Sequence, residues 1–453
     1  MNKKIKSYLK NIKFADLDNW SVQYLFETSF SYNEKYKLTK ISSFLTRNKT
    51  NIDISDNEIY KRVTIKINNG GIFLRDIEKG LNIGTKKQFI ITEGQFIVSK
   101  IDARNGAFGV VPNELNNAII TGNFWTFDVN YSLINPHFLS LITTTNEFIL
   151  FCSNASNGTT NRHYLQEEAF LNVKIPLPSL EKQNELLEKF NKNILLAQKQ
   201  ENEAIKLQES IEIFFNKELG IKFNTKNNAK SNKLLQVIDY FDIEKWGVDK
   251  LKSNNQIIYT KKFLQKNISS ICTVSSGGTP NRSNKNYYTG QIPWIKTGEV
   301  VNDIIMDTEE KITEEAINNS SAKIYPKDSL IIAMYGQGLT RGRTAKLGID
   351  ASTNQACAVL SNINNDIIDT DYLWYYLMNE YHRLRELASG NNQPNLNAEM
   401  IKNYKVIIPS FEIQEKIVLE IKRIKDEVKI LKEKAELNRQ NAIKEFEKEI
   451  FIL

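Results

Sequence analysis

The sequence has few of the residues that form disulfides or hold metal ions. Its 453 residues include three cysteines and three histidines, which are widely separated along the chain. These six residues are Cys152, Cys272, Cys357, His137, His163 and His382. Such spacing predicts neither a disulfide framework nor a metal site, and it argues against a nuclease built on histidines.

Long apolar runs are also missing. A membrane-spanning helix needs about 20 consecutive apolar residues, and no apolar run approaches that length. The stretch Met1–Lys10 lacks the apolar core of a secretory signal. We therefore expect a cytoplasmic protein that does not enter a membrane.

Motifs of several enzyme classes are absent. Amino-methyltransferases hold a flipped base with a Pro-Pro-aromatic motif, but none of the nine prolines is adjacent to another. No nucleotide-binding glycine fingerprint is present, and the turn Gly277–Pro280 lacks the lysine of a phosphate loop. Pairs such as Glu309 and Lys311 are expected by chance in a chain this rich in both. We therefore expect no catalytic residue.

The net charge is +7 and the sequence pI is about 8.9. A mildly basic chain suits a nucleic-acid partner. The abundance of Lys, Asn and Ile is also typical of an AT-rich genome, so the charge alone is weak support for DNA binding.

One stretch of the sequence occurs twice. The segments Ile175–Gln183 and Ile407–Gln414 each read as a strand, a proline stop, and a serine cap with a glutamate close behind it. The matching residues are Pro178, Ser179, Glu181 and Gln183 in the first copy and Pro409, Ser410, Glu412 and Gln414 in the second. About forty residues without Pro or Gly follow each copy, which predicts two long helices.

Apolar residues in both helices recur mostly at steps of three and four, as in a coiled-coil seam. The seam residues are Leu187, Phe190, Ile194, Ala197, Ala204, Leu207, Ile211, Phe214 and Phe215 in the first helix, and Ile417, Ile421, Ile424, Val428, Leu431, Ala435, Ala442 and Phe446 in the second. The polar residues Glu201, Gln208 and Asn438 interrupt the seams and would fix their register. Two matched seams predict that the helices, each about 60 Å long, pair with each other. The alternative is that each helix packs only on its own domain.

The repeat extends beyond the helices. Phe14–Val22 resembles Phe241–Val248, and Ile41–Ser43 returns as Ile268–Ser270. We expect an α+β fold in which two mixed α/β domains alternate with two long helices, with an internal pseudo-twofold repeat. The predicted boundaries are 1–178 for the first domain, 179–222 for the central helix, 223–409 for the second domain and 410–453 for the last helix.

Within the domains, Arg62–Ile67 alternates as a strand that turns Val63, Ile65 and Ile67 to a core. His137–Phe151 and Tyr372–Leu387 are each predicted to form one helix.

Loops between the expected strands carry residue types that read DNA. Arginine pairs with guanine, Asn or Gln pairs with adenine, and Lys holds phosphates. The candidate DNA-binding residues are Lys86, Lys87, Lys100, Arg104, Asn105 and Arg162 in the first half, and Thr279, Arg282, Gln337, Arg341, Arg343, Asn391, Asn392 and Gln393 in the second. Each residue alone could simply belong to a turn. Taken together, the Arg341–Arg343 and Asn391–Asn397 loops favour DNA contact.

The order of these motifs resembles the specificity (S) subunit of type I restriction–modification systems over nearly the whole chain. In the first half the resemblance rests on Gly94–Gly109 and on Ile175–Ser179 with Gln183. The motifs of the second half are Gly277–Pro280, Ile292–Trp294, Asn354–Ala358, Gly390–Leu396 and Ile408–Ser410 with Gln414. The first half departs from the second because it has Thr46–Asn51 in place of the Gly-Gly-Thr-Pro stretch.

The resemblance implies two target-recognition domains, each binding one half of a bipartite site in double-stranded DNA. Two long helices, paired as an antiparallel coiled coil, would hold the domains at a fixed separation. It implies partners as well: methyltransferase (M) subunits, two in number, and restriction (R) subunits. S-adenosylmethionine, ATP and Mg²⁺ would be held by those partners, and this chain would bind no cofactor. The alternatives from other classes are a free-standing nuclease with an unrecognised active site and a scaffold that binds only proteins.

Overall fold

The computed structural model describes residues 32–157, 164–223, 257–336, 338–388 and 395–452. The chain divides into two compact units, unit 1 with residues 1–200 and 433–453, and unit 2 with residues 201–432. Each unit thus contains one globular domain and part of each long helix. The domain boundaries predicted from the sequence follow the helix ends and stay a prediction.

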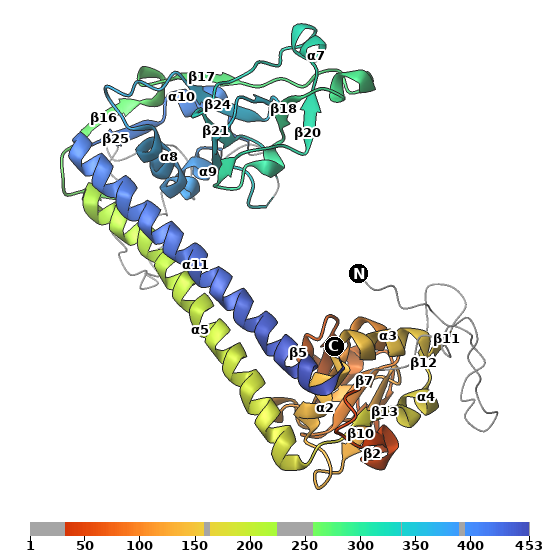
Figure 1. Cartoon of the computed structure of the whole chain (residues 1–453). Helices are drawn as coiled ribbons and strands as arrows, with labels where there is room; N and C mark the ends of the chain where they lie inside the picture. Colours follow the sequence, from red (N-terminus) through yellow and green to blue (C-terminus); the bar gives the residue numbers. More distant parts are fainter. Residues whose placement is uncertain (1–31, 158–163, 224–256, 337, 389–394, 453) are drawn as a thin grey trace. The chain divides into compact units, whose positions relative to one another are not determined.

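The globular part of unit 1 contains a four-stranded sheet of order β2-β10-β7-β8 and a five-stranded sheet of order β3-β6-β9-β4-β5 (Figure 1). Two short pairs, β1-β13 and β11-β12, accompany them. The strands are β1 (Leu38–Lys40), β2 (Leu45–Asn48), β3 (Asn51–Asp53), β4 (Ile59–Lys66), β5 (Gly71–Lys79), β6 (Lys87–Ile90), β7 (Phe96–Ser99), β8 (Phe108–Val110), β9 (Ile119–Ile120), β10 (Phe124–Val129), β11 (Ser156–Asn157), β12 (Tyr164–Leu165) and β13 (Lys174–Pro176). The helices are α2 (Pro136–Thr143), α3 (Asn146–Asn154) and α4 (Glu167–Asn172).

Strand β7 is the centre of this domain because all four of its residues are buried. Successive side chains of a strand point to opposite faces. Phe96 and Val98 therefore join the core formed with α2, α3 and α4, whereas Ile97 joins a second core with Val63 and Ile65 of β4. The strand is thus covered on both faces.

In unit 2, a five-stranded sheet has the order β17-β24-β21-β22-β19, and a three-stranded sheet has the order β20-β18-β23. The pairs β14-β15 and β16-β25 complete the described strands. The strands are β14 (Ile221–Phe223), β15 (Ile257–Tyr259), β16 (Leu264–Asn267), β17 (Thr273–Ser276), β18 (Ile292–Ile295), β19 (Ile304–Ile305), β20 (Glu310–Ile312), β21 (Leu330–Ala333), β22 (Thr344–Leu347), β23 (Ser352–Thr353), β24 (Cys357–Ser361) and β25 (Lys405–Ile408). The helices are α7 (Glu314–Asn318), α8 (Thr370–Asn379), α9 (Tyr381–Leu387) and α10 (Ala398–Lys402).

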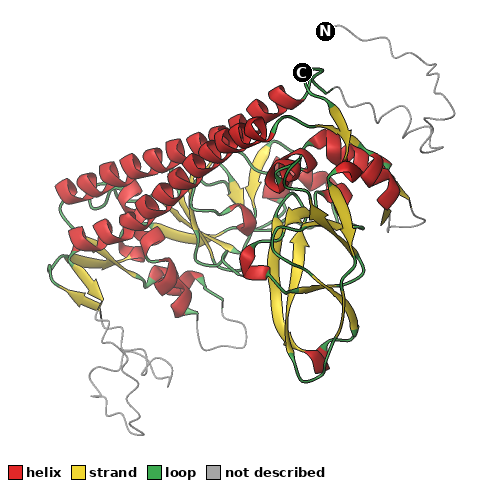
Figure 2. Ribbon diagram, turned by 90° about the horizontal axis from the view of Figure 1, so that it is seen from below, coloured by secondary structure: helices red, strands yellow, loops and turns green. Residues whose placement is uncertain are grey.

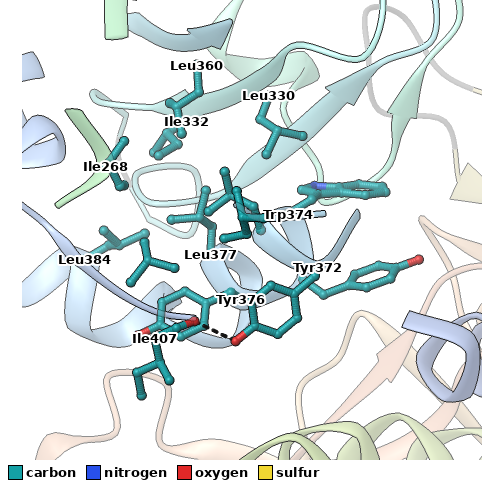
Figure 3. Close-up of a cluster of buried hydrophobic side chains, with 14 of the residues drawn as sticks. Ile268, Leu330, Ile332, Leu360, Tyr372, Trp374, Tyr376, Leu377, Leu384 and Ile407 are labelled. Atoms are coloured by element: carbon teal, nitrogen blue, oxygen red, sulfur yellow. Dashed lines mark hydrogen bonds between the residues drawn. The ribbon is translucent and has the colours of Figure 1, made fainter. Parts of the chain in front are cut away.

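Helix α8 packs its aromatic side chains against the five-stranded sheet of unit 2 (Figure 3). Leu330 and Ile332 of β21 face this helix, and Ile331 and Ala333 of the same strand face a second core. The hydroxyl of Tyr372 donates a hydrogen bond of 2.8 Å to the carbonyl of Ile407, so the phenol is buried with a partner (Figure 3).

The two units repeat one topology, so the predicted fold class is confirmed. The order β2-β10-β7-β8 in unit 1 corresponds to β17-β24-β21-β22 in unit 2, with β7 and β21 in the same central place. The two-stranded pair β1-β13 likewise corresponds to β16-β25. A 3₁₀ turn of sequence Ile-Ser-Ser follows β1 in the first pair and β16 in the second. Ile41 and Ile268, which open these turns, are both fully buried.

The long helices are α5 (Leu180–Leu219) and α11 (Phe411–Ile450), each 40 residues and drawn without a break in Figure 2. Within each unit they run antiparallel side by side. In unit 1, the rings of Phe190 and Phe446 lie 6.4 Å apart, and Asn438 donates to Gln200 at 2.8 Å. In unit 2, Ala204 packs with Ile424 and Val428. The predicted pairing of the seams is therefore confirmed.

Two side chains predicted to be buried are exposed. Gln208 is exposed, because Ala204 and Leu207 contact α11 and Gln208 lies outside that contact. The glutamine of α5 that pairs with Asn438 is Gln200. Ile67 is 50% exposed, because β4 ends one residue earlier.

The two helices predicted inside the domains are each divided. The first ends at Thr143, and the side chain of Thr145 caps a new helix by accepting from Phe148 N–H. The second divides at Glu380, which is 1% exposed and accepts two hydrogen bonds from Arg383. In both places a polar residue with local hydrogen bonds divides a pattern that is continuous in apolar residues.

The duplicated glutamine joins each domain to the start of its long helix. Gln183 accepts a hydrogen bond from the backbone N–H of Asn135 at 2.8 Å and donates to the carbonyl of Pro178 at 2.9 Å. Gln414 repeats this arrangement with Asp369 and Pro409, at 2.8 and 2.9 Å. Asn135 and Asp369 cap α2 and α8, so the same bond links equivalent elements in both units.

We predict that Gln414→Glu destabilises the protein. Gln414 is 1% exposed. An ionised carboxylate would place an oxygen against the Pro409 carbonyl without a donor between them. We expect a loss of about 1–3 kcal/mol in the free energy of unfolding, measured by denaturant titration, and a larger loss as the pH rises and the carboxyl ionises.

Gln208→Glu is the matched control, because it makes the same chemical change at an exposed position of α5. If both variants unfolded alike at neutral pH, the glutamine bond would carry no stability.

Candidate nucleic-acid interface

Loops from distant parts of the sequence meet at the end of the central strand in each unit. In unit 1, the N–H of Leu165 donates at 2.9 Å to the carbonyl of Lys100, the residue after β7. In unit 2, the N–H of Leu396 donates at 3.1 Å to the carbonyl of Met334, the residue after β21. An equivalent backbone bond therefore joins the segment after the central strand to a segment distant in the sequence in both halves.

The Lys100 side chain is half-buried beside Trp125. Its ammonium nitrogen lies 5.8 Å from the centre of the indole ring. Burial, and then the positive charge of Arg47, lower the pKa of Lys100. Arg47 itself is held in place, since it donates to the Thr126 carbonyl at 2.7 Å and pairs with Glu167 at 3.3 Å. Two cations thus lie close together here, with the Glu167 carboxylate beside Arg47.

Arg104 and Asn105 lie in the 3₁₀ turn Ala103–Asn105 that follows this strand. Asn105 is exposed, and its amide donates to Asp102 at 3.3 Å. Lys86 and Lys87 lie at β6 in the five-stranded sheet. Lys86 is already engaged, because its ammonium pairs with Asp56 at 2.6 Å.

In unit 2, Arg282 is held by three neighbours. It pairs with Glu310 at 2.6 Å, and its guanidinium carbon lies 4.3 Å from the ring centre of Tyr288 and 4.7 Å from that of Trp294. The side chain is 51% exposed, so it remains open to solvent on one side. Reading a base edge with this guanidinium would require it to leave Glu310.

The loop with Arg341 and Arg343 connects β21 to β22 and rests on α9. Arg385 donates to the Arg341 carbonyl at 2.8 Å, and the hydroxyl of Tyr381 donates to the Leu339 carbonyl at 2.8 Å. Arg343 is half-buried and forms no ion pair with any residue that the structure describes. The loop therefore presents positive charge from a fixed backbone.

Gln355 was not among the candidates predicted from the sequence. The hydroxyl of Thr279 donates to the side-chain oxygen of Gln355, which brings two distant loops together. Gln355 lies in the Asn354–Ala358 motif, so the signal was present in the sequence. Five candidates lie outside the described residues: Arg162, Gln337, Asn391, Asn392 and Gln393.

Within the described ranges, no group of three His, Cys, Asp or Glu side chains is placed to hold a metal ion. No helix among these residues is long and apolar enough to cross a membrane. Cys152, Cys272 and Cys357 are buried free thiols.

Comparison with known proteins identifies the family. The model of the type I restriction modification DNA specificity domain matches residues 33–207 and again residues 260–439, one match for each half of the repeat. The chain belongs to this family. The prediction of a non-catalytic subunit that provides DNA specificity is thereby confirmed, and neither alternative gains support.

Two curated relatives are specificity subunits of type I restriction enzymes. The chain is 29% identical to the MjaIX subunit of Methanocaldococcus jannaschii over 193 residues, which are 41% of this chain and 43% of that protein. It is 24% identical to the HindI subunit of Haemophilus influenzae over 379 residues, 72% of this chain and 80% of that protein. The chain thus spans less than half of the first relative and most of the second.

The fold has a counterpart among solved structures. A chain from a structure of a type I R-M system, described in terms of complex assembly and conformational transition, aligns with a TM-score of 0.58 and 16% identity. The alignment covers 93% of this chain and 97% of that one. At this identity the likeness establishes a shared fold and nothing more.

We predict different effects from the two kinds of cation. Arg343→Ala should weaken discrimination at one base pair by about 1–3 kcal/mol, because an arginine reads a base edge. Lys100→Ala should weaken binding to all sequences alike, because a lysine neutralises a phosphate. The slope of the logarithm of the binding constant against the logarithm of the salt concentration should become shallower by about one. Both are measured by titrating the assembled complex with the cognate site and its single-base variants at several salt concentrations.

Lys429→Ala on the exposed face of α11 serves as the control for removing a positive charge. If both loop variants bound cognate and random DNA as the unmodified chain does, the assignment of these loops to DNA contact would be contradicted.

Proposed function

We propose that each globular domain of this specificity subunit binds one half of a bipartite site in double-stranded DNA. The repeated topology supports the proposal, because two copies of one scaffold carry different loops at the same strand end. Different loops on equal scaffolds suit two half-sites of different sequence. The candidate residues named above, including those outside the described ranges, remain the proposed contacts.

The paired helices are proposed to set the spacing between the half-sites. Each has 40 residues, about 60 Å at 1.5 Å per residue. The part-buried hydrogen bond between Asn438 and Gln200 supports a fixed register. A polar pair in an apolar seam is lost when one helix slips along the other.

Family members bind DNA and assemble with other subunits of the system. For this chain we propose two methyltransferase subunits and, in the restricting complex, restriction subunits. S-adenosylmethionine, ATP and Mg²⁺ would be bound by those partners and not by this chain. The site of action would be the cytoplasm, where the DNA and the partner subunits are found.

Exposed apolar residues on α5 support docking of the methyltransferase. In unit 1, Leu195 is 68% exposed and Leu196 is 43% exposed; in unit 2, Ile205 and Ile213 are 53% and 70% exposed. These side chains lie outside the seam that pairs with α11. Apolar side chains at such exposure are typical of a surface that a partner covers.

The first test of the function is the methylation pattern of the genome. Deleting the gene should remove adenine methylation at one bipartite motif, two short blocks around an unspecific gap. Returning the gene should restore that motif. Recognition by two half-sites would be ruled out if the methylation that depends on the gene fell on a single uninterrupted motif. It would also be ruled out if returning the gene restored methylation without any sequence motif.

For docking, we predict that Leu195→Glu weakens association with the methyltransferase subunit at least tenfold, which is about 1.4 kcal/mol or more. The specificity subunit itself should unfold as before, because Leu195 is exposed. Gln440→Glu introduces the same charge at an exposed position of α11, away from the proposed surface, and should bind like the unmodified chain. Equal affinities of the two variants, measured by titration of purified subunits, would place the docking surface elsewhere.

A further inference from the structure

The turn between β4 and β5 has a backbone that few side chains adopt. Asn68 and Asn69 have φ values of 57° and 59°, in the left-handed region. The N–H of Gly70 bonds back to the carbonyl of Ile67 at 3.3 Å. Two successive left-handed residues are the mark of a type I′ hairpin turn, in which Asn and Gly are favoured.

This turn is bonded to the loop that carries Arg104 and Asn105. The N–H of Asn68 donates to the carbonyl of Asn105 at 2.7 Å, and the N–H of Asn69 donates to the carbonyl of Gly106 at 3.1 Å. A Cβ atom at Gly106 would lie 2.3 Å from the Asn69 side-chain oxygen, so the two segments are in close contact. Residues 37 positions apart in the sequence therefore form one surface.

The two asparagine side chains of the turn differ in what they bind. The amide of Asn69 is committed to structure, because it donates to the carbonyl of Thr144 at 3.1 Å. The amide of Asn68 is exposed and forms no hydrogen bond with any residue that the structure describes. Its backbone is thus fixed by Asn105, while its donor and acceptor face solvent.

We propose that Asn68 is a specificity-determining residue, which reads a base edge in the half-site bound by unit 1. An amide presents a donor and an acceptor side by side, the pattern that pairs with adenine in the major groove. A fixed backbone keeps the loss of entropy on binding small, because only the side-chain torsions are ordered. The inference rests on the proposed function, and it adds a residue from a segment that the sequence motifs did not indicate.

Asn68→Gly tests the inference without changing the turn, because glycine adopts left-handed φ at no steric cost. Asn117→Gly is the matched control, since Asn117 is also exposed, has φ of 62° and lies in a different turn of unit 1. Methylation rates of the complex assembled with each variant are measured on the cognate site and on every single-base variant of it.

We expect Asn68→Gly to lose about tenfold or more in discrimination at one base pair of one block, with the other block unchanged. Asn117→Gly should match the unmodified chain. Asn68→Asp should weaken methylation of the cognate site and improve that of a cytosine variant in relative terms, because a carboxylate only accepts hydrogen bonds.

Unchanged discrimination at every position, or an equal loss at all positions, would overturn the role of Asn68. Those outcomes differ from a failure of the proposed function, in which the unmodified complex would itself show no bipartite preference. Denaturant unfolding separates a change in discrimination from a folding defect. Asn68→Gly should unfold with the same midpoint as the unmodified chain.

Discussion

The structure depends on one buried hydrogen-bonding residue, used once in each half. Gln183 and Gln414 lie where a domain passes into its long helix, and each amide both accepts and donates at that point. Water cannot replace these bonds at a buried site, so an unmatched group there is costly. The bonds tie the cap of a domain helix to the first turn of the long helix. The direction in which the long helix leaves its own domain is therefore fixed within each unit.

The central strands provide the second constraint. β7 and β21 are covered on both faces, so their ends are rigid starting points for loops. The loops themselves are free to differ because their contacts are local: Lys100 lies beside Trp125, whereas the Arg341–Arg343 loop rests on Tyr381 and Arg385. Variation at these strand ends leaves both cores and the helix junctions untouched. This separation suits a chain in which two copies of one scaffold carry different loops.

Much of the fold could be predicted because its signals are local and duplicated. The Pro-Ser caps and the three–four spacing of apolar residues were enough to predict α5 and α11 and their pairing. The errors arose where a contact distant in sequence decided the outcome. Glu380, just after the end of α8, accepts a hydrogen bond from the Tyr404 hydroxyl, and Gln200 pairs with Asn438 across the two long helices.

The candidate site was less predictable for the same reason. Composition identified arginines and amides in loops, but it could not show that Arg282 is held by Glu310 and two aromatic rings. Nor could it show that the turn at Asn68 is bonded to the loop at Asn105, since hydrogen bonds between backbone atoms leave no mark in residue type. The roles of the individual contacts remain predictions, and they depend on side-chain surroundings rather than on motifs.

The three buried cysteines have a consequence for the chemistry of the whole chain. Burial raises the pKa of Cys152, and raises that of Cys272 and Cys357 to about 12. Thiolate is the reactive form, so at neutral pH these sulfurs resist oxidation and alkylation. A cysteine introduced at an exposed position would then react alone. The natural sequence can thus carry a single fluorescent or spin label, and movements of the loops on DNA can be followed without first removing any native thiol.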